Sequence, residues 1–373
     1  MLSLRGGAEL VAYWAQLGSI IELVAGVALA GVGTGISVLV AQSARPERQR
    51  ELLQQSLRLG FATSAPAMLG VIAVSLAFPG ALAGGGPPQY LVVLAAAIGC
   101  VAVIPGMVNG YWLGQQRRGL MLLLAAGTAA TMLAAALVAP QSQILLALSL
   151  AQGLPALAAM FVLREAGART ASDTEALRRY VPPGLTIGLL TPLATLAVRD
   201  IVAAQMSWHE VGLIQALWRV SDWVANVAAG VMAVYFLPRL SATHGTPRFA
   251  PELRRAALVT LLPSALALAV EAVFQRPLLR LLYDGSFAIA DTAVVLLLAG
   301  TLARIASWLP LYALYAMRRT RPLVIGEFLS MPLFAALLAA YPGPLSLEVA
   351  GALWLVAYAG YGFFNLWAVR RAA

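Results

Sequence analysis

The sequence predicts an all-α polytopic membrane protein with about eleven transmembrane helices in two lobes. Its 373 residues are 61% hydrophobic and only 11% charged, so a soluble fold could not keep that much apolar surface from water. Long apolar segments recur from one end of the chain to the other. The loops between them alternate between arginine-rich and nearly arginine-free. Together these observations exclude a separate soluble domain.

Each membrane-spanning helix needs about 20 predominantly apolar residues. Eleven segments satisfy this condition: 9–42, 52–82, 89–113, 119–138, 143–164, 182–205, 209–238, 253–282, 290–316, 322–341 and 347–369. Several exceed a simple crossing, which predicts tilt or projection beyond the lipid.

The loop arginines predict the orientation of the chain. They gather in alternate connections: Arg45, Arg48 and Arg50; Arg117 and Arg118; Arg164, Arg169, Arg178 and Arg179; Arg239, Arg248, Arg254 and Arg255; Arg318, Arg319 and Arg321; and the tail, Arg370 and Arg371. Basic loops face the cytoplasm, so we expect a cytoplasmic C-terminus. Eleven crossings then leave the N-terminus outside.

Several function classes are disfavoured by composition. The net charge of +9 comes from arginines in short loops and does not indicate nucleic acid. Cys100 is the only cysteine, and His209 and His244 lie far apart, so we expect no metal site. The chain has no lysine and no phosphate-binding loop, which argues against ATP hydrolysis. We expect no bound cofactor, although transport could be coupled to a proton or sodium gradient.

Two related halves are predicted. The longest polar connection, 164–179, leaves five helices before it and six after, so we place an N-terminal lobe at 1–168 and a C-terminal lobe at 169–373. The string Ala25-Gly26-Val27 recurs as Ala229-Gly230-Val231, and each precedes an arginine loop that contains Pro-Glu. Five helices followed by six resemble an arrangement of two six-helix lobes that lacks its first helix.

Charges within apolar segments are the main candidate site residues. Arg219 and Asp222 lie three residues apart on one helix face and could pair, with Gln215 one turn earlier on the same face and Trp218 beside them. A structural ion pair between helices is one interpretation, and a polar patch in a substrate cavity is the other.

Other helices also carry charges at depth, which favours the cavity interpretation. Arg304 has no acid within one turn, so either another helix or an anionic ligand supplies its partner. Glu22 lies near the middle of the first predicted helix. Arg199 and Asp200 are expected nearer the outer surface.

The segment 198–242 resembles the O-antigen and enterobacterial-common-antigen flippases, in the polysaccharide-transporter branch of the multidrug/oligosaccharidyl-lipid/polysaccharide exporter superfamily. The similar features are Arg199 before a short outer turn, Val211-Gly212, Gln215-Ala216, Arg219 with Ser221-Asp222, and the exit Tyr235-Phe236-Leu237-Pro238-Arg239-Leu240-Ser241. A second patch, 30–42, resembles the end of the family's second helix. The resemblance implies twelve helices in two six-helix lobes, with Met1 to Gly7 forming the outer turn after a missing first helix.

The resemblance also implies a function. Such a protein would move an undecaprenyl-pyrophosphate-linked oligosaccharide from the inner to the outer leaflet by alternating access. Arg219 and Arg304 would contact pyrophosphate, Arg199 would lie at the outer exit, and Asp222 would partner Arg219 or serve in gating or proton coupling. Carboxylates, amides and tryptophans would contact sugars, or the carboxylates would carry coupling protons; the residues concerned are Asp200, Glu22, Gln215 and Trp218. Membrane lipids, a polysaccharide polymerase and chain-length proteins are the expected partners.

Three other classes stay open at this point, one of them a non-transporting structural partner in a polysaccharide assembly complex. A lipid II flippase or a drug/cation antiporter of the same superfamily would differ in cargo. A membrane-embedded polysaccharide polymerase or ligase would need a sizeable outer loop for its catalytic groups, and every predicted outer loop here is short.

Overall fold

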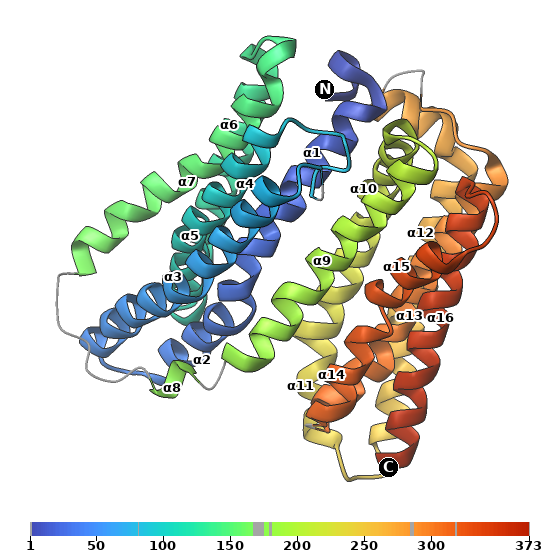
Figure 1. The fold of residues 1–373 in the computed structure, drawn as a ribbon. Helices are drawn as coiled ribbons and strands as arrows, with labels where there is room; N and C mark the ends of the chain where they lie inside the picture. The colour runs from blue at the N-terminus through green and yellow to red at the C-terminus, as the bar shows by residue number, and fades with distance from the viewer. Residues whose placement is uncertain are drawn as a thin grey trace. The chain divides into compact units, whose positions relative to one another are not determined.

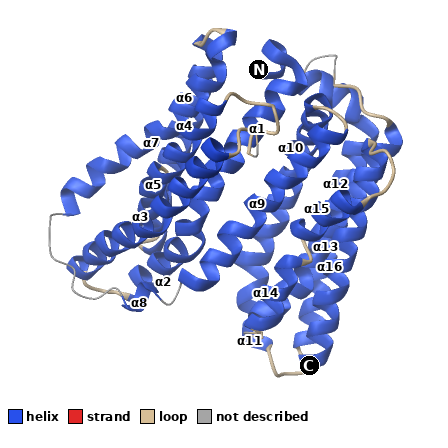
Figure 2. Cartoon of the chain, viewed as in Figure 1, coloured by secondary structure: helices blue, strands red, loops and turns tan. Residues whose placement is uncertain are grey.

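The chain folds entirely as helices and the turns that connect them. A computed structural model describes residues 2–80, 82–166, 175–178, 181–283, 287–317 and 319–372. Within these ranges no strand occurs, which confirms the predicted all-α class (Figures 1 and 2). The predicted lobe boundary at 168 and three loop arginines, Arg169, Arg179 and Arg318, lie outside the described residues.

Two compact units make up the chain. The first comprises Tyr13–Leu196, and the second comprises Leu2–Ala12 together with Ala197–Ala373. The helices up to α9 are α1 (Leu2–Ala28), η1 (Leu29–Gly33), α2 (Thr34–Gln42), α3 (Pro46–Ala77), α4 (Gln89–Val101), α5 (Val103–Gly114), α6 (Arg118–Val138), η2 (Gln141–Gln143), α7 (Ile144–Ala166), α8 (Glu175–Arg178) and α9 (Val181–Gln205). Those that follow are α10 (Trp208–Val231), η3 (Met232–Phe236), α11 (Leu237–Thr243), α12 (Phe249–Leu282), α13 (Asp291–Ala316), α14 (Thr320–Phe328), α15 (Met331–Ala340) and α16 (Leu347–Ala372). Helices α1 and α9 contribute to both units, and the lobes 1–168 and 169–373 stay a prediction.

Ten helical segments among the described residues are long and apolar enough to cross a membrane. They correspond to ten of the eleven predicted spans. The remaining predicted span, 182–205, forms the continuous helix α9 but is not among the ten. The predicted count is therefore one higher than the count over the described residues.

Two of these spans share an irregularity that follows the repeated Ala-Gly-Val string. Gly7–Gln42 and Trp208–Thr243 are each 36 residues long. In each, the α-helix widens into a five-residue π-helix shortly after the string, at η1 and at η3. The two spans therefore match in length and in backbone conformation as well as in sequence.

Small residues allow close helix packing in the first unit. Gly106, Gly110 and Gly114 recur every four residues along one face of α5, which packs on η1 and α2. A Cβ atom added at these glycines would lie 2.3, 2.8 and 2.7 Å from its nearest neighbour, all shorter than real contacts. The glycine stripe therefore permits an approach that any side chain would prevent.

The second unit has a similar seam between α13 and α16. Gly300 lies directly beneath the Trp354 ring, and a Cβ at Gly300 would fall 2.0 Å from that ring. Gly351 packs on the backbone of Leu297, and Gly362 packs on Ser307. These helices of the second unit run side by side along their length (Figure 1).

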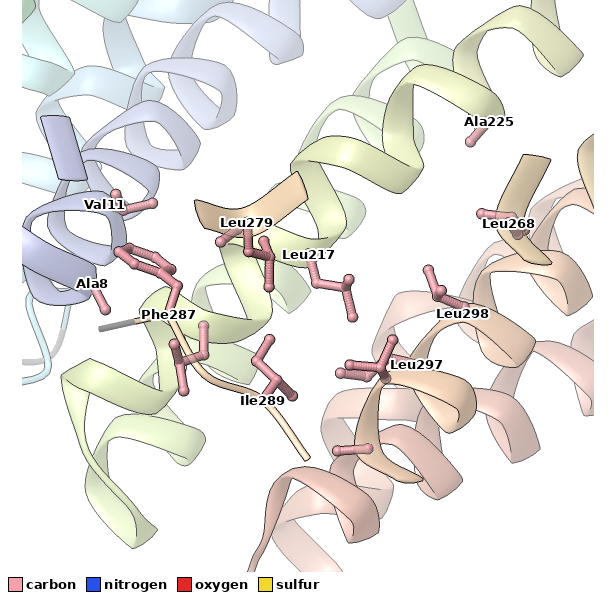
Figure 3. Packing of buried hydrophobic residues seen from close by; sticks show 14 of the residues in the cluster. Ala8, Val11, Leu217, Ala225, Leu268, Leu279, Phe287, Ile289, Leu297 and Leu298 are labelled. Atoms are coloured by element: carbon pink, nitrogen blue, oxygen red, sulfur yellow. The ribbon is translucent and has the colours of Figure 1, made fainter. Parts of the chain in front are cut away.

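An apolar cluster lies among α10, α12 and α13 of the second unit. Leu217 of α10, Leu279 of α12 and Leu297 of α13 point toward one another, and Phe287 and Ile289 cover them from the connection before α13 (Figure 3). All five side chains are buried. Because lipid is as apolar as these side chains, their contribution comes from packing rather than from exclusion of water.

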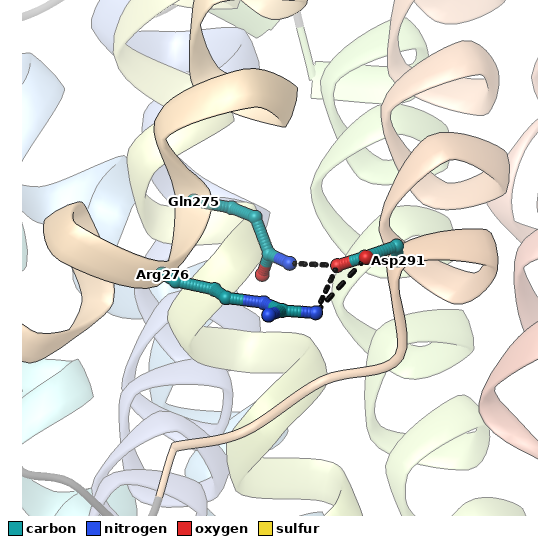
Figure 4. A network of polar contacts seen from close by, with 3 residues as sticks. All are labelled: Gln275, Arg276 and Asp291. Carbon is teal, nitrogen blue, oxygen red and sulfur yellow. Dashed lines mark hydrogen bonds and ion pairs between the residues drawn. The ribbon is translucent and has the colours of Figure 1, made fainter.

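A polar clamp closes the connection between α12 and α13. Arg276 donates to both carboxylate oxygens of Asp291 at 3.1 and 3.0 Å, and Gln275 donates to the same carboxylate at 2.8 Å (Figure 4). Asp291 is the first residue of α13, where a negative charge also favours the helix dipole.

Replacing Arg276 by Ala should change stability very little. The side chains of Arg276 and Asp291 are 70% and 69% exposed, and exposed ion pairs contribute at most about 1 kcal/mol. Asp291 also keeps its bond from Gln275. The thermal unfolding midpoint of purified R276A should match that of the parent chain, and a large drop would contradict this view of the clamp.

Candidate functional site

An ion pair between Arg304 of α13 and Asp222 of α10 is central to the charged region of the second unit. The guanidinium donates to the Asp222 carboxylate at 2.5 Å. The Arg304 side chain is only 17% exposed, whereas that of Asp222 is 42% exposed. Of the two partners left open for Arg304, a second helix is the one that the structure supplies.

Arg304 is surrounded by aromatic rings. Its guanidinium lies 5.7 Å from the ring centroids of both Trp308 and Trp354. Trp354 in turn packs on Trp218 at 4.8 Å and on Phe334 at 5.0 Å. A cation beside indole faces in a low-dielectric environment is stabilised electrostatically, so the rings hold Arg304 in place. Trp218 is buried, and its position fits packing.

Arg219 does not pair with Asp222, contrary to the expectation from their i, i+3 spacing. Asp222 meets Arg304 instead, because the more buried guanidinium has the greater need for a counter-ion. The Arg219 side chain is exposed, and no ion pair holds it within the described residues. Arg219 is therefore the cation of α10 that remains available to a ligand.

Tyr283 lies close enough to Arg219 for the two to interact. Burial raises the pKa of the Tyr283 hydroxyl, and the positive charge of Arg219 offsets part of that rise. The same hydroxyl donates to the carbonyl of Ala216 at 3.4 Å. Tyr283 thereby links the end of α12 to the part of α10 that carries Arg219.

Arg199 and Gln215 form a separate contact. The Arg199 Nε donates to the Gln215 amide oxygen at 2.8 Å, joining α9 to α10, and both side chains are buried. Asp200, the neighbour of Arg199, is half-buried. The Gln215 side chain therefore binds Arg199, although Gln215 and Asp222 lie on the same helix.

Glu22 lies in the first unit. It is exposed on α1. It stays a predicted site residue.

Sequence reasoning missed a buried acid, Glu271. Glu271 lies within α12 and is only 5% exposed. Neither of its carboxylate oxygens has a hydrogen-bond partner within the described chain, and Asp222 lies close enough to interact electrostatically. The signal available in the sequence was the spacing of two polar residues, Glu271 and Gln275, one helical turn apart.

A second missed cluster joins α14 to α16. The Tyr361 hydroxyl lies 3.5 Å from the Glu327 carboxylate. Asn365 is fully buried and lies near the Tyr361 hydroxyl. Neither its amide oxygen nor its amide nitrogen has hydrogen-bond geometry with a described partner. The helix break between α14 and α15 comes directly after Glu327, at Leu329 and Ser330. No local pattern in the sequence marks this arrangement.

Solved transporters share this fold. An inward-facing multidrug resistance MATE family transporter of the MOP superfamily matches with a TM-score of 0.74 and 14% identity, over 100% of this chain and 92% of its own. The lipid II flippase MurJ, in an inward closed conformation, matches with a TM-score of 0.71 and 12% identity, over 99% and 82%. A MOP superfamily transporter from Pyrococcus furiosus matches at 0.61 and 13%, over 100% and 89%. No family model and no curated relative matches the sequence.

The fold is therefore that of the MOP superfamily transporters. This confirms the predicted fold class. The neighbours include drug transporters and a lipid flippase alike, so the fold does not by itself select a cargo.

Proposed function

We propose that this chain is a flippase that carries an undecaprenyl-pyrophosphate-linked oligosaccharide, an O-antigen or common-antigen repeat unit, across the bacterial inner membrane. The observation that carries the proposal is Arg219, an exposed arginine that has no ion pair within the described residues. Arg219 lies on α10 together with Asp222, which pairs with the second arginine, Arg304. Guanidinium groups are the preferred partners of pyrophosphate because they donate two parallel hydrogen bonds. The fold shared with MurJ supports a lipid-linked cargo.

The two arginines have different roles in this proposal. Arg219 is the first contact of the pyrophosphate because no acid competes for it within the described residues. Arg304 is held by Asp222, so an incoming phosphate must displace a carboxylate that is 42% exposed and can leave. Asp222 thus acts as a counter-ion that is exchanged for cargo, while the rings of Trp308 and Trp354 keep Arg304 in position.

Two carboxylates, Glu271 (buried) and Glu327 (half-buried), suit energy coupling. Within the described residues Glu271 has no hydrogen-bonding partner and lies near Asp222, and Glu327 interacts with Tyr361. Releasing Asp222 from Arg304 would place another negative charge beside Glu271, which favours uptake of a proton or a cation. Cargo binding and ion binding would then be linked through Asp222.

A lipid II flippase is the second candidate, favoured by the likeness to MurJ, and a drug/cation antiporter is the third, favoured by the MATE likeness. In each of the three candidate functions, the cargo would bind at α10 and α13. An antiporter for cationic drugs would need accessible acids more than an accessible arginine, so the exposed Arg219 favours an anionic cargo.

Replacing Arg219 by Ala should lower cargo transport about 10- to 150-fold while the protein stays abundant in the membrane. A hydrogen bond to a charged group contributes roughly 1.5–3 kcal/mol, and each 1.4 kcal/mol is tenfold. The measurement is surface glycan in cells that depend on this chain, with membrane abundance followed by immunoblot. R276A is the matched control, since it removes an exposed arginine from a surface clamp. Parental glycan levels in R219A would exclude Arg219 from the cargo site.

A further inference from the structure

An apolar groove of about 400 Å³ lies between α6 and α7 of the first unit, with Trp112 of α5 also lining it. The α6 wall runs from Leu120 to Thr131, and the α7 wall includes Leu154 and Pro155. Gly127 faces the groove without a side chain, and a Cβ there would meet no atom within 4 Å. The groove is therefore open at Gly127, where a larger side chain would enter it.

Its walls suit a hydrocarbon chain. The only hydroxyl groups that line it belong to Thr128 and Thr131, and each donates within α6, to the carbonyls of Leu124 at 2.8 Å and Thr128 at 2.9 Å. Both hydroxyl donors are therefore satisfied within α6, and among the described lining residues only the Trp112 indole adds a further polar group.

The groove is on a lipid-facing helix and has the length of one leaflet. Leu122 and Leu123 of α6 are 70% and 69% exposed, as expected for a helix that faces lipid. Leu120 and Thr131 lie eleven residues apart, which corresponds to about 16 Å along the helix. That is roughly half of the ~30 Å hydrocarbon core.

Two arginines lie at one end of the groove. Arg117 and Arg118 immediately precede Leu120, and both are exposed. Within the described residues, no ion pair or side-chain hydrogen bond holds either arginine. By the distribution of loop arginines, this is the end that we predict to be cytoplasmic. Basic residues at this depth attract anionic lipid headgroups.

We propose that the groove binds one acyl chain of an anionic phospholipid of the arginine-side leaflet, with its phosphate on Arg117 and Arg118. The apolar walls, the leaflet-length dimension and the unpaired cations at one end each match a different part of such a lipid. This site uses neither Arg219 nor Arg304, so it does not depend on the identity of the cargo. The bound lipid is a resident partner of the fold.

The test is native mass spectrometry of the purified chain in the presence of phosphatidylglycerol or of phosphatidylcholine with identical acyl chains. The parent chain should retain one phosphatidylglycerol about thirtyfold more tightly than phosphatidylcholine, because about 1 kcal/mol per arginine favours the anionic over the neutral headgroup. Gly127→Leu, which fills the groove where space is free, should abolish retention of both lipids.

Matched variants make the outcomes decisive. Gly70→Leu adds the same side chain to an exposed glycine of α3 with no atom within 4 Å, and it should retain lipid normally. Arg117→Gln with Arg118→Gln should lose the preference for phosphatidylglycerol, whereas Arg370→Gln with Arg371→Gln should keep it. Equal retention by G127L and G70L would overturn the groove site. Equal affinity of the parent chain for the two lipids would overturn the headgroup assignment, and preferential retention of undecaprenyl phosphate would show that cargo lipid occupies the groove instead.

Discussion

Replacing Gly300 by Ala should destabilise the second unit by about 3 kcal/mol or more, at the upper end of the usual range for overpacking a core. The new Cβ would lie 2.0 Å from Trp354 Cδ1 and 2.8 Å from both Cγ and Nε1. The ring cannot yield easily, because Trp354 is fully buried and is packed by Trp218 at 4.8 Å and by Tyr358 at 4.4 Å. Helices α13 and α16 would have to separate, which removes the support for Arg304 as well.

The measurement is the thermal unfolding midpoint of the purified chain, followed by tryptophan fluorescence. Gly230→Ala is the control, because Gly230 lies in α10 of the same unit and a Cβ there meets no atom within 4 Å. We expect G300A to unfold many degrees below the parent chain and G230A to match or exceed it, since Ala favours a helix by up to about 1 kcal/mol over Gly. Equal midpoints for the two variants would contradict the packing of Trp354 on Gly300.

Asp222→Ala should destabilise the chain more than Arg304→Ala, although each removes half of the same ion pair. D222A leaves the Arg304 guanidinium, 17% exposed, without a counter-ion, and arginine cannot release its proton to avoid the cost. R304A leaves Asp222, which is 42% exposed and can take up a proton. Breaking a fully buried pair costs roughly 3–5 kcal/mol, so we expect about 3 for D222A and about half of that for R304A.

The double variant separates the pair from its surroundings. Removing both charges should leave the chain more stable than D222A alone, because no uncompensated guanidinium remains. Thermal midpoints of the four chains give the coupling between the two residues. Additive effects of the two substitutions, or a greater loss in R304A than in D222A, would contradict the assigned pairing.

The sequence sufficed for the helical class and for most of the spans, because a run of about 20 apolar residues has one main solution in lipid. The Ala-Gly-Val strings even marked the helices that widen into η1 and η3. The sixth predicted span, 182–205, is the exception: it forms α9 but is not among the ten apolar spans of the described residues.

The partner of Asp222 could not be predicted in the same way. Spacing along α10 made Arg219 the nearest cation, but Arg304, 82 residues later, takes its place because tertiary packing buries it. The burial of Glu271 was missed for a related reason. It depends on the packing of α12 against α10 and α13, and the sequence of α12 alone does not reveal that packing. Periodicity reports faces of one helix, whereas ion pairs depend on which faces meet.

The central claim is that the exposed arginine of α10 receives an anionic, lipid-linked cargo. The most direct measurement is transport in proteoliposomes loaded with undecaprenyl-pyrophosphate-linked oligosaccharide, read by a lectin that detects only sugar on the outer surface. The account predicts movement by the parent chain and by R276A, a loss of about 10- to 150-fold in R219A, and partial recovery in Arg219→Lys, which restores the charge without the bidentate geometry. Undiminished movement in R219A, or movement of a cationic drug but not of the lipid-linked oligosaccharide by the parent chain, would contradict it.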